Sequence, residues 1–114
     1  MALKRFKLDV AGSNNATLIQ AGSVKVLNIF VNNAAASERW VRLYDKATTP
    51  TGGTDVPVIV INIPASSSKE IALKIEIEFL LGLGIGITGA AAYNDNTSVT
   101  AHDVQIYIGY DDLR

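Results

Sequence analysis

The sequence predicts an all-β protein: a single-domain antiparallel β-sandwich, jelly-roll-like, with about seven to eight short strands. Apolar and polar residues alternate with a period of two along much of the chain, which is typical of half-buried strands. Segments rich in Gly, Asn, Ser and Pro separate these runs, and no run begins with a convincing helix start. Because 114 residues fit one domain, we expect residues 1–114 to form one sandwich, with a barrel as the alternative.

The first half of the chain supplies about four of the expected strands. Apolar side chains at Phe6, Leu8 and Val10 alternate with charged ones, which is typical of a half-buried strand or of an extended arm with one apolar face. Residues 1–12 are therefore either an N-terminal arm or the first strand of the sandwich. Further strands are expected at residues 17–20, at the β-branched run 23–32 and at 39–46.

The second half supplies the remaining strands. Residues 47–55 are rich in Thr, Pro and Gly and predict a surface loop. The run 56–63 is almost entirely apolar, and Pro57 lies near its start, where a missing amide donor is tolerated. Residues 69–79 alternate strictly between apolar and mostly charged side chains, and residues 104–110 alternate again, so both runs predict amphipathic strands.

Glycine alternates with bulky apolar residues over 81–89. A strand with this pattern packs one face through side chains and leaves bare backbone on the other. We therefore expect another part of the protein to lie close against the bare face.

Composition excludes several classes of partner. The chain has 10 Lys and Arg against 11 Asp and Glu, a formal net charge of -1, so it has no overall field to attract a nucleic acid. Cysteine is absent, which excludes disulfides and thiolate metal sites. The longest apolar stretch, 79–92, is interrupted by glycines and is too short to cross a bilayer as a helix. We expect no nucleic acid, membrane or small-molecule substrate.

No pattern in the chain predicts a catalytic, cofactor or metal site. His102 and Asp103 are the one pair that resembles an imidazole beside an orienting carboxylate, but adjacent residues on a strand point to opposite faces. Asp95, Asp111 and Asp112, together with Asp103, are oxygen ligands in type, yet their spacing matches no calcium loop. The protein is therefore predicted not to be an enzyme and to need no cofactor.

Trp40, Arg42 and Tyr44 fall on one face of the strand expected at 39–46. Trp, Tyr and Arg are the residue types most enriched in protein interface hot spots, so this stripe is a candidate oligomer interface. The alternatives are that Trp40 fills the sandwich core, or that Trp40 and Tyr44 stack on sugar rings.

Lys4, Arg5, Phe6, Lys7 and Leu8 combine three cations with two apolar side chains in alternation. This cluster is too small to bind nucleic acid well. Its alternation suits a segment that adds to the edge of a neighbouring sheet, although a strand within the protein's own sandwich fits equally.

Several stretches together resemble small structural proteins of tailed bacteriophages and prophages. The resemblance rests on Val-Leu-Asn-Ile-Phe-Val-Asn-Asn at 26–33, Trp-Val-Arg-Leu-Tyr-Asp-Lys at 40–46, Pro50 with Gly-Thr-Asp-Val-Pro-Val at 53–58, and Leu-Gly-Ile-Gly-Ile-Thr-Gly-Ala-Ala at 83–91. It spans most of residues 24–110, and residues 69–80 depart from it most. These motifs are structural rather than chemical.

The resemblance implies a virion protein similar to capsid decoration (cement) proteins. Such a protein would be made in the bacterial host cytoplasm, bind the major capsid protein as a homotrimer on the outer capsid surface, and stabilise the shell. Under this interpretation Trp40, Arg42 and Tyr44 contact the other copies, and residues 4–8 contact the shell. The alternatives are a tail, baseplate or head-fibre component, or a carbohydrate-binding β-sandwich.

Overall fold

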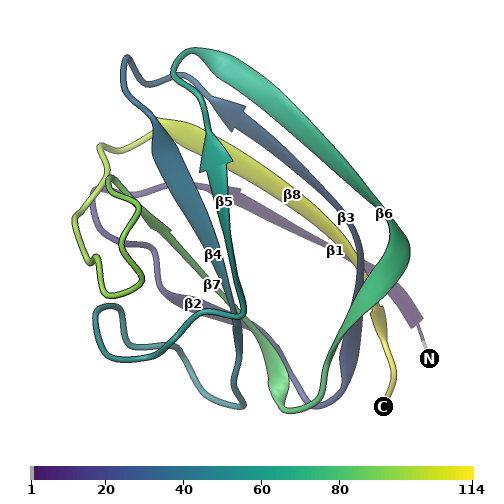
Figure 1. Ribbon diagram of the computed structural model, residues 1–114. Coiled ribbons are helices and arrows are strands. Elements are labelled where there is room, and N and C mark those ends of the chain that lie inside the picture. The colour runs from purple at the N-terminus through teal and green to yellow at the C-terminus, as the bar shows by residue number, and fades with distance from the viewer. Residues whose placement is uncertain (1) are drawn as a thin grey trace.

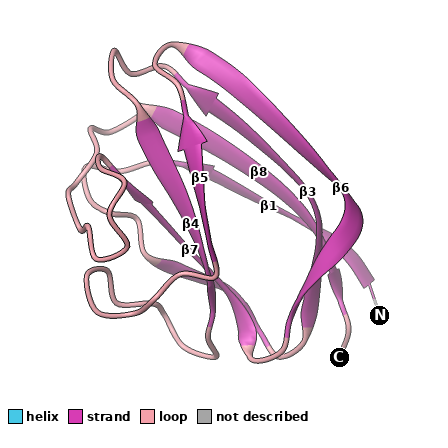
Figure 2. Cartoon of the chain, viewed as in Figure 1, coloured by secondary structure: helices cyan, strands magenta, loops and turns pink. Residues whose placement is uncertain are grey.

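The computed structural model describes residues 2–114, apart from the side chains of residues 70–76. Over this range the chain forms eight strands and no helix (Figure 2). No described segment is a helix long and apolar enough to cross a membrane. The strands are β1 (Ala2–Asp9), β2 (Thr17–Ala21), β3 (Val24–Asn33), β4 (Arg39–Asp45), β5 (Ile59–Ile63), β6 (Ser67–Phe79), β7 (Gly82–Thr88) and β8 (Val104–Asp112).

The strands form two four-stranded sheets that pack face to face (Figure 1). The first sheet has the order β1-β8-β3-β6, and the second has the order β2-β7-β4-β5. The pairing is nested: β1 pairs with β8, β2 with β7, β3 with β6 and β4 with β5, all antiparallel. Eight strands paired in this way make a jelly roll, so the predicted β-sandwich is confirmed.

Each expected strand is present, with small differences in its bounds. The largest difference is at β5, which begins at Ile59 rather than at residue 56. Pro57 has no amide hydrogen to donate to β4, so regular pairing with β4 starts only after it. The Val58 amide donates to the Leu43 carbonyl oxygen at 2.7 Å.

The core lies between the sheets and is built from alternating residues of both. On β8, for example, Val104, Ile106 and Ile108 are buried while Tyr107 between them is exposed. The fully buried apolar side chains include Val24, Val26, Ile29, Val31, Val41, Leu43, Leu83, Ile85, Ile87, Ile106 and Ile108. Burial of this continuous apolar layer supplies the main driving force for the fold.

A bulge in β3 changes which of its residues face the core. The register against both β6 and β8 shifts between Val26 and Asn28. Before the shift Val24 and Val26 point inward, and after it Ile29 and the other odd-numbered residues do. An unbroken alternation would turn Phe30 inward together with Val26, so the bulge is the reason why Phe30 faces solvent.

β1 is a strand of the sandwich's own first sheet. It pairs with β8 along its whole length, from Ala2 opposite Asp112 to Asp9 opposite Gln105. Residues 2–9 therefore pair within the sandwich's own first sheet in this structure. β1 forms one edge of the first sheet, and β6 forms the other.

β6 confirms the strand expected at 69–79. Its last residues follow the predicted alternation, since Ile77 packs against the core, Glu78 is exposed and Phe79 is fully buried. The predicted facing of residues 71–76 falls on side chains outside those described.

The bare backbone face of β7 is covered by neighbouring segments, as its glycine pattern predicts. A Cβ atom built on Gly84 would lie 2.7 Å from Cγ of Pro50, in the loop between β4 and β5. A Cβ atom on Gly86 would make only ordinary contacts, 3.5 Å from Cε2 of Tyr44 at the closest. The loop that follows β4 therefore packs directly onto β7.

The two glycines predict different effects of the same substitution. Gly84→Ala should lower the free energy of unfolding by about 1–2 kcal/mol, because the rigid Pro50 ring must move away. Gly86→Ala should change it by no more than about 0.5 kcal/mol, since the added methyl group fits. Urea unfolding of both variants measures the difference, and equal destabilisation would contradict it.

Candidate binding surface on the first sheet

A hollow of about 400 Å³ lies on the solvent-facing side of the first sheet. It is formed by β1, β8 and β3, and its lining is mostly apolar. The lining residues are Arg5, Phe6, Lys7, Asn28, Phe30, Tyr107, Ile108 and Gly109. We call this feature the basic-aromatic hollow.

The strand register brings these residues together in two rows. Lys7 on β1 pairs with Tyr107 on β8, which in turn pairs with Phe30 on β3. In the neighbouring row Gly109 lies between Arg5 and Asn28. Side chains of paired residues lie on the same side of a sheet, so both rows project from the solvent face.

Two aromatic rings form one wall of the hollow. The ring centroids of Phe30 and Tyr107 are 5.9 Å apart, and their planes are tilted by 52°. Both side chains keep more than a third of their surface exposed, 37% for Phe30 and 39% for Tyr107. Nζ of Lys7 lies 5.6 Å from the centre of the Tyr107 ring, within the range of a cation–π interaction.

Gly109 lets the Asn28 side chain lie across the floor of the hollow. The Gly109 amide donates to Oδ1 of Asn28 at 3.1 Å, and a Cβ atom at this position would lie 2.6 Å from the same oxygen. Any other residue would displace the Asn28 side chain. The bulge in β3 turns Asn28 toward solvent, and the glycine in β8 leaves room for its amide.

The rim on the β1 side is positively charged. Neither Arg5 nor Lys7 forms an ion pair with any acidic side chain that the structure describes. Asp9 and Asp111 project from the same face further along β1 and β8. Asp9 accepts hydrogen bonds from Gln105 at 2.9 Å and contacts Nδ1 of His102 at 2.6 Å, and these two contacts hold its pKa below the usual range.

The residues predicted to contact a shell divide between the two sides of β1. Arg5 and Lys7 line the solvent side of the hollow, whereas Phe6 and Leu8 pack against the core. Lys4 forms an ion pair with Asp112 at 3.2 Å.

The predicted interface residues share one face of β4, as expected, but differ in exposure. Trp40 is half-buried, while Arg42 is 0% exposed and Tyr44 is 3% exposed. The core side of β4 is filled by Val41 and Leu43, so Trp40 does not fill the core. Trp40 and Tyr44 do not form the exposed pair of rings that the sugar-stacking alternative needs, because Tyr44 is covered.

Arg42 is covered because it holds the loop between β7 and β8 against the second sheet. Its Nε donates to Oγ1 of Thr88 at 2.9 Å, and its terminal nitrogens donate to the carbonyl oxygens of Tyr93 at 3.3 Å and of Ala90. A fully buried guanidinium with three acceptors is a structural anchor. Arg42 and Tyr44 thus have almost no surface to offer a partner in the isolated chain.

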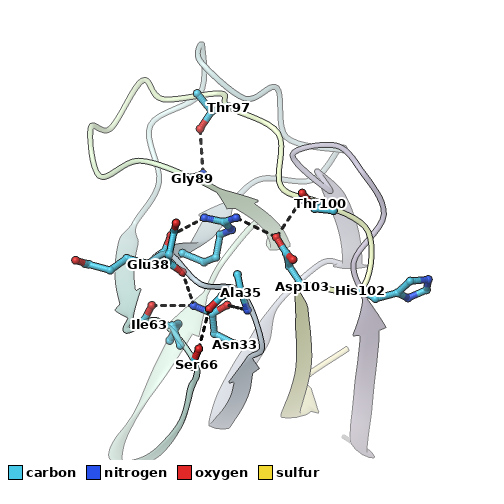
Figure 3. Close-up of polar contacts among 12 residues, drawn as sticks. Asn33, Ala35, Glu38, Ile63, Ser66, Gly89, Thr97, Thr100, His102 and Asp103 are labelled. Atoms are coloured by element: carbon cyan, nitrogen blue, oxygen red, sulfur yellow. Dashed lines mark hydrogen bonds and ion pairs between the residues drawn. The ribbon is translucent and has the colours of Figure 1, made fainter.

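His102 and Asp103 point away from each other (Figure 3). Asp103 accepts from Arg39 and from the Thr100 amide at 3.0 and 3.1 Å. His102 contacts Asp9 instead, and its side chain is 79% exposed. The sequence neighbours therefore do not form an imidazole–carboxylate pair.

Three of the four aspartates considered as metal ligands have separate partners. Asp103 pairs with Arg39, Asp112 with Lys4 and Arg114, and Asp95 accepts from Ala90 and Thr97 in the loop after β7. Among the described residues there is no group of three or more His, Cys, Asp or Glu side chains that could hold a metal ion.

Asp112 forms ion pairs with Lys4 on β1 and with Arg114. These contacts predict that the protein loses stability in acid. Hydrogen bonds from Arg114, supplemented by Lys4, hold the pKa of Asp112 well below its usual range. A carboxyl with a lowered folded-state pKa stabilises the fold above its unfolded pKa of about 3.9, and this stabilisation is lost as the pH falls further.

We therefore expect Asp112→Asn to lose less thermal stability than the wild type between about pH 6 and about pH 2. Melting curves by circular dichroism measure this. Glu78→Gln, which alters an exposed carboxylate, is the control, and its melting temperature should fall with pH as steeply as that of the wild type. An equally steep fall in the melting temperature of Asp112→Asn would contradict the prediction.

Phe30 and Tyr107 were not identified from the sequence as members of a site. Tyr107 had a usable signal, because it alternates with the apolar Ile106 and Ile108 and must face solvent on a half-buried strand. Phe30 had none, because its orientation depends on the bulge in β3.

No family model matches the sequence, and no curated protein matches it. Among solved structures, two of the Tobacco streak virus coat protein match the chain. One is 11% identical with a TM-score of 0.40, and the other, of the coat protein dimer, is 10% identical with a TM-score of 0.42. Each match covers 96% of this chain and 85% of the coat protein chain.

Proposed function

We propose that this chain is a non-enzymatic structural protein of a bacteriophage virion, a capsid decoration (cement) protein that binds the outer head surface across capsid subunit boundaries. The observation that carries the proposal is the basic-aromatic hollow beside the free edge of β1, where exposed aromatic rings and cations form a surface of hot-spot composition. The sequence resemblance over residues 24–110 supplies the class of partner, the major capsid protein.

The physical role needs binding and no chemistry. A protein that binds the assembled shell, and not its separated subunits, stabilises the shell by mass action. Arg5 and Lys7, which the sequence placed in the shell-contacting segment, lie on the rim of the hollow. The contact surface of the proposal is therefore the solvent face of β1 together with Phe30 and Tyr107.

The proposed assembly state is a homotrimer, with the outer face of the second sheet as the contact between copies. Trp40 is the half-buried member of the Trp40, Arg42, Tyr44 stripe and would make the contact, while Arg42 holds the loop beside it and Tyr44 is covered. Three copies on one axis would bind a symmetric shell with avidity.

Trp40→Ala should convert the trimer to a monomer without unfolding the chain, because loss of one hot-spot tryptophan removes much of the contact energy. Light scattering coupled to size exclusion gives the mass in solution. Tyr107→Ala removes an exposed aromatic side chain from the other sheet and should leave the trimer intact. A folded Trp40→Ala variant that remains trimeric would refute this interface.

Immunogold labelling of virions from the source tests the proposal as a whole. Antibody raised against the purified protein should label the head densely and evenly. Label confined to the tail or to one vertex would replace the proposal with a tail, baseplate or head-fibre component. Particles without label, combined with binding on a glycan array, would replace it with a carbohydrate-binding module.

A further inference from the structure

The shape of the basic-aromatic hollow indicates what kind of group it can receive. The apolar face of a sugar ring stacks best on an aromatic face presented as a platform, but the Phe30 and Tyr107 planes are tilted by 52° and form a notch. The Asn28 amide, which lies over Gly109, adjoins this notch. The lining is mostly apolar, so a bulky apolar side chain matches it in both shape and polarity.

The charge on the rim indicates what must flank that side chain. Arg5 and Lys7 are alternate residues on one face of β1, so their Cα atoms are roughly 6–7 Å apart. They stand on one side of the hollow, whereas Asn28 and Phe30 stand on the other. Acidic residues beside the apolar side chain would meet these two cations.

A second copy of this chain does not fit the same surface in a symmetric pair. Facing hollows related by a two-fold axis perpendicular to the strands would bring Arg5 and Lys7 of one copy near the same cations of the other. An axis parallel to the strands would place these cations against Asn28 and Phe30, which carry no negative charge. Neither arrangement matches the charge on the rim, so the hollow fits an acidic segment of a different protein better than a second hollow.

We propose that the basic-aromatic hollow receives a single bulky apolar side chain flanked by acidic residues from a partner protein. The identity of that partner as the major capsid protein rests on the proposed function, whereas the chemistry of the segment rests on the hollow alone. Phe30 and Tyr107 contact the apolar side chain, and Arg5 and Lys7 bind the flanking carboxylates.

The first test is a titration of isotope-labelled protein with capped pentapeptides, followed by NMR. The probe Glu-Glu-Leu-Glu-Glu should shift the backbone signals of Phe30, Tyr107 and Gly109, and should bind less tightly as NaCl rises from about 50 to about 500 mM. Lys-Lys-Leu-Lys-Lys and Glu-Glu-Ser-Glu-Glu, which change only the charge or only the apolar residue, should each bind about tenfold more weakly.

The double variant Arg5→Glu/Lys7→Glu supplies the matched control on the protein side. Both side chains are exposed, so the variant should keep the wild-type melting temperature. It should prefer the lysine peptide to the glutamate peptide. Equal affinity of the wild type for the three peptides, or shifts only elsewhere on the surface, would overturn the proposal, as would binding of maltohexaose at Phe30 and Tyr107 with no peptide bound.

A sedimentation assay with virions separates this inference from the proposed function. Wild-type protein that binds stripped particles, together with a double variant that binds them at least about tenfold more weakly, supports both. Equal binding of the two proteins to particles overturns the inference and leaves the function in place. Charge-dependent peptide binding without particle binding overturns the function and leaves the inference in place.

Discussion

Asn33→Asp is expected to lower the free energy of unfolding by about 3 kcal/mol, since it reverses the polarity of a buried contact between the sheets. Asn33 is 1% exposed, and its Nδ2 lies 3.0–3.2 Å from the carbonyl oxygens of Ser37, Ile63 and Pro64. Its Oδ1 accepts from the Ala35 amide at 3.0 Å (Figure 3). A carboxylate would accept from Ala35 but would face the three carbonyl oxygens with no hydrogen to donate.

The adjacent Asn32→Asp is a matched control. Asn32 lies on the solvent face of β3, where it donates to Gln105 and accepts from Ser68. The same substitution there should cost less than about 1 kcal/mol. Urea unfolding compares the two variants. The deficit of Asn33→Asp should shrink at acidic pH, because a protonated carboxyl regains a donor. Similar losses in both variants would show that Asn33 does not join the sheets.

Arg42→Ala is expected to lower the free energy of unfolding by about 3 kcal/mol and to release the loop between β7 and β8. The substitution leaves a cavity and removes the donors that reach Thr88, Ala90 and Tyr93. Hydrogen exchange should therefore accelerate selectively in peptides from residues 89–103, beyond the change in overall stability.

Arg5→Ala removes the same side chain from an exposed position and should change the free energy of unfolding by less than about 0.5 kcal/mol. Thermal unfolding and hydrogen exchange of both arginine variants make the comparison. Unchanged exchange in residues 89–103 of Arg42→Ala would mean that the loop is held by its own contacts.

The strands were predictable because their signal is local. Alternation of side chains defines each strand, and Gly, Pro and Asn mark the connections, so the positions of all eight follow from short stretches of sequence. The sequence also predicted that another segment packs against the glycine residues of β7, because bare backbone cannot remain uncovered in a core layer. That this segment contains Pro50 depends on how a distant loop folds.

The exposure of individual side chains was less predictable, for two physical reasons. A single bulge reverses the facing of β3 after Val26, and no residue type marks that bulge in the sequence. Loops also cover strand faces: Arg42 has the pattern of an exposed residue but is buried by residues about fifty positions later. The candidate site combines both effects, since Phe30 depends on the bulge while Arg5, Lys7 and Tyr107 follow simple alternation.

β8 lies between β1 and β3 in the first sheet, yet it comes after the other seven strands in the sequence. Until β8 is in place β1 has no strand partner, because Ala2 pairs with Asp112 and Asp9 with Gln105. Contacts this distant in sequence form slowly. We therefore expect β1 to join the first sheet late in folding, and the apolar faces of β1 and β3 to stay open to other chains until β8 pairs with both.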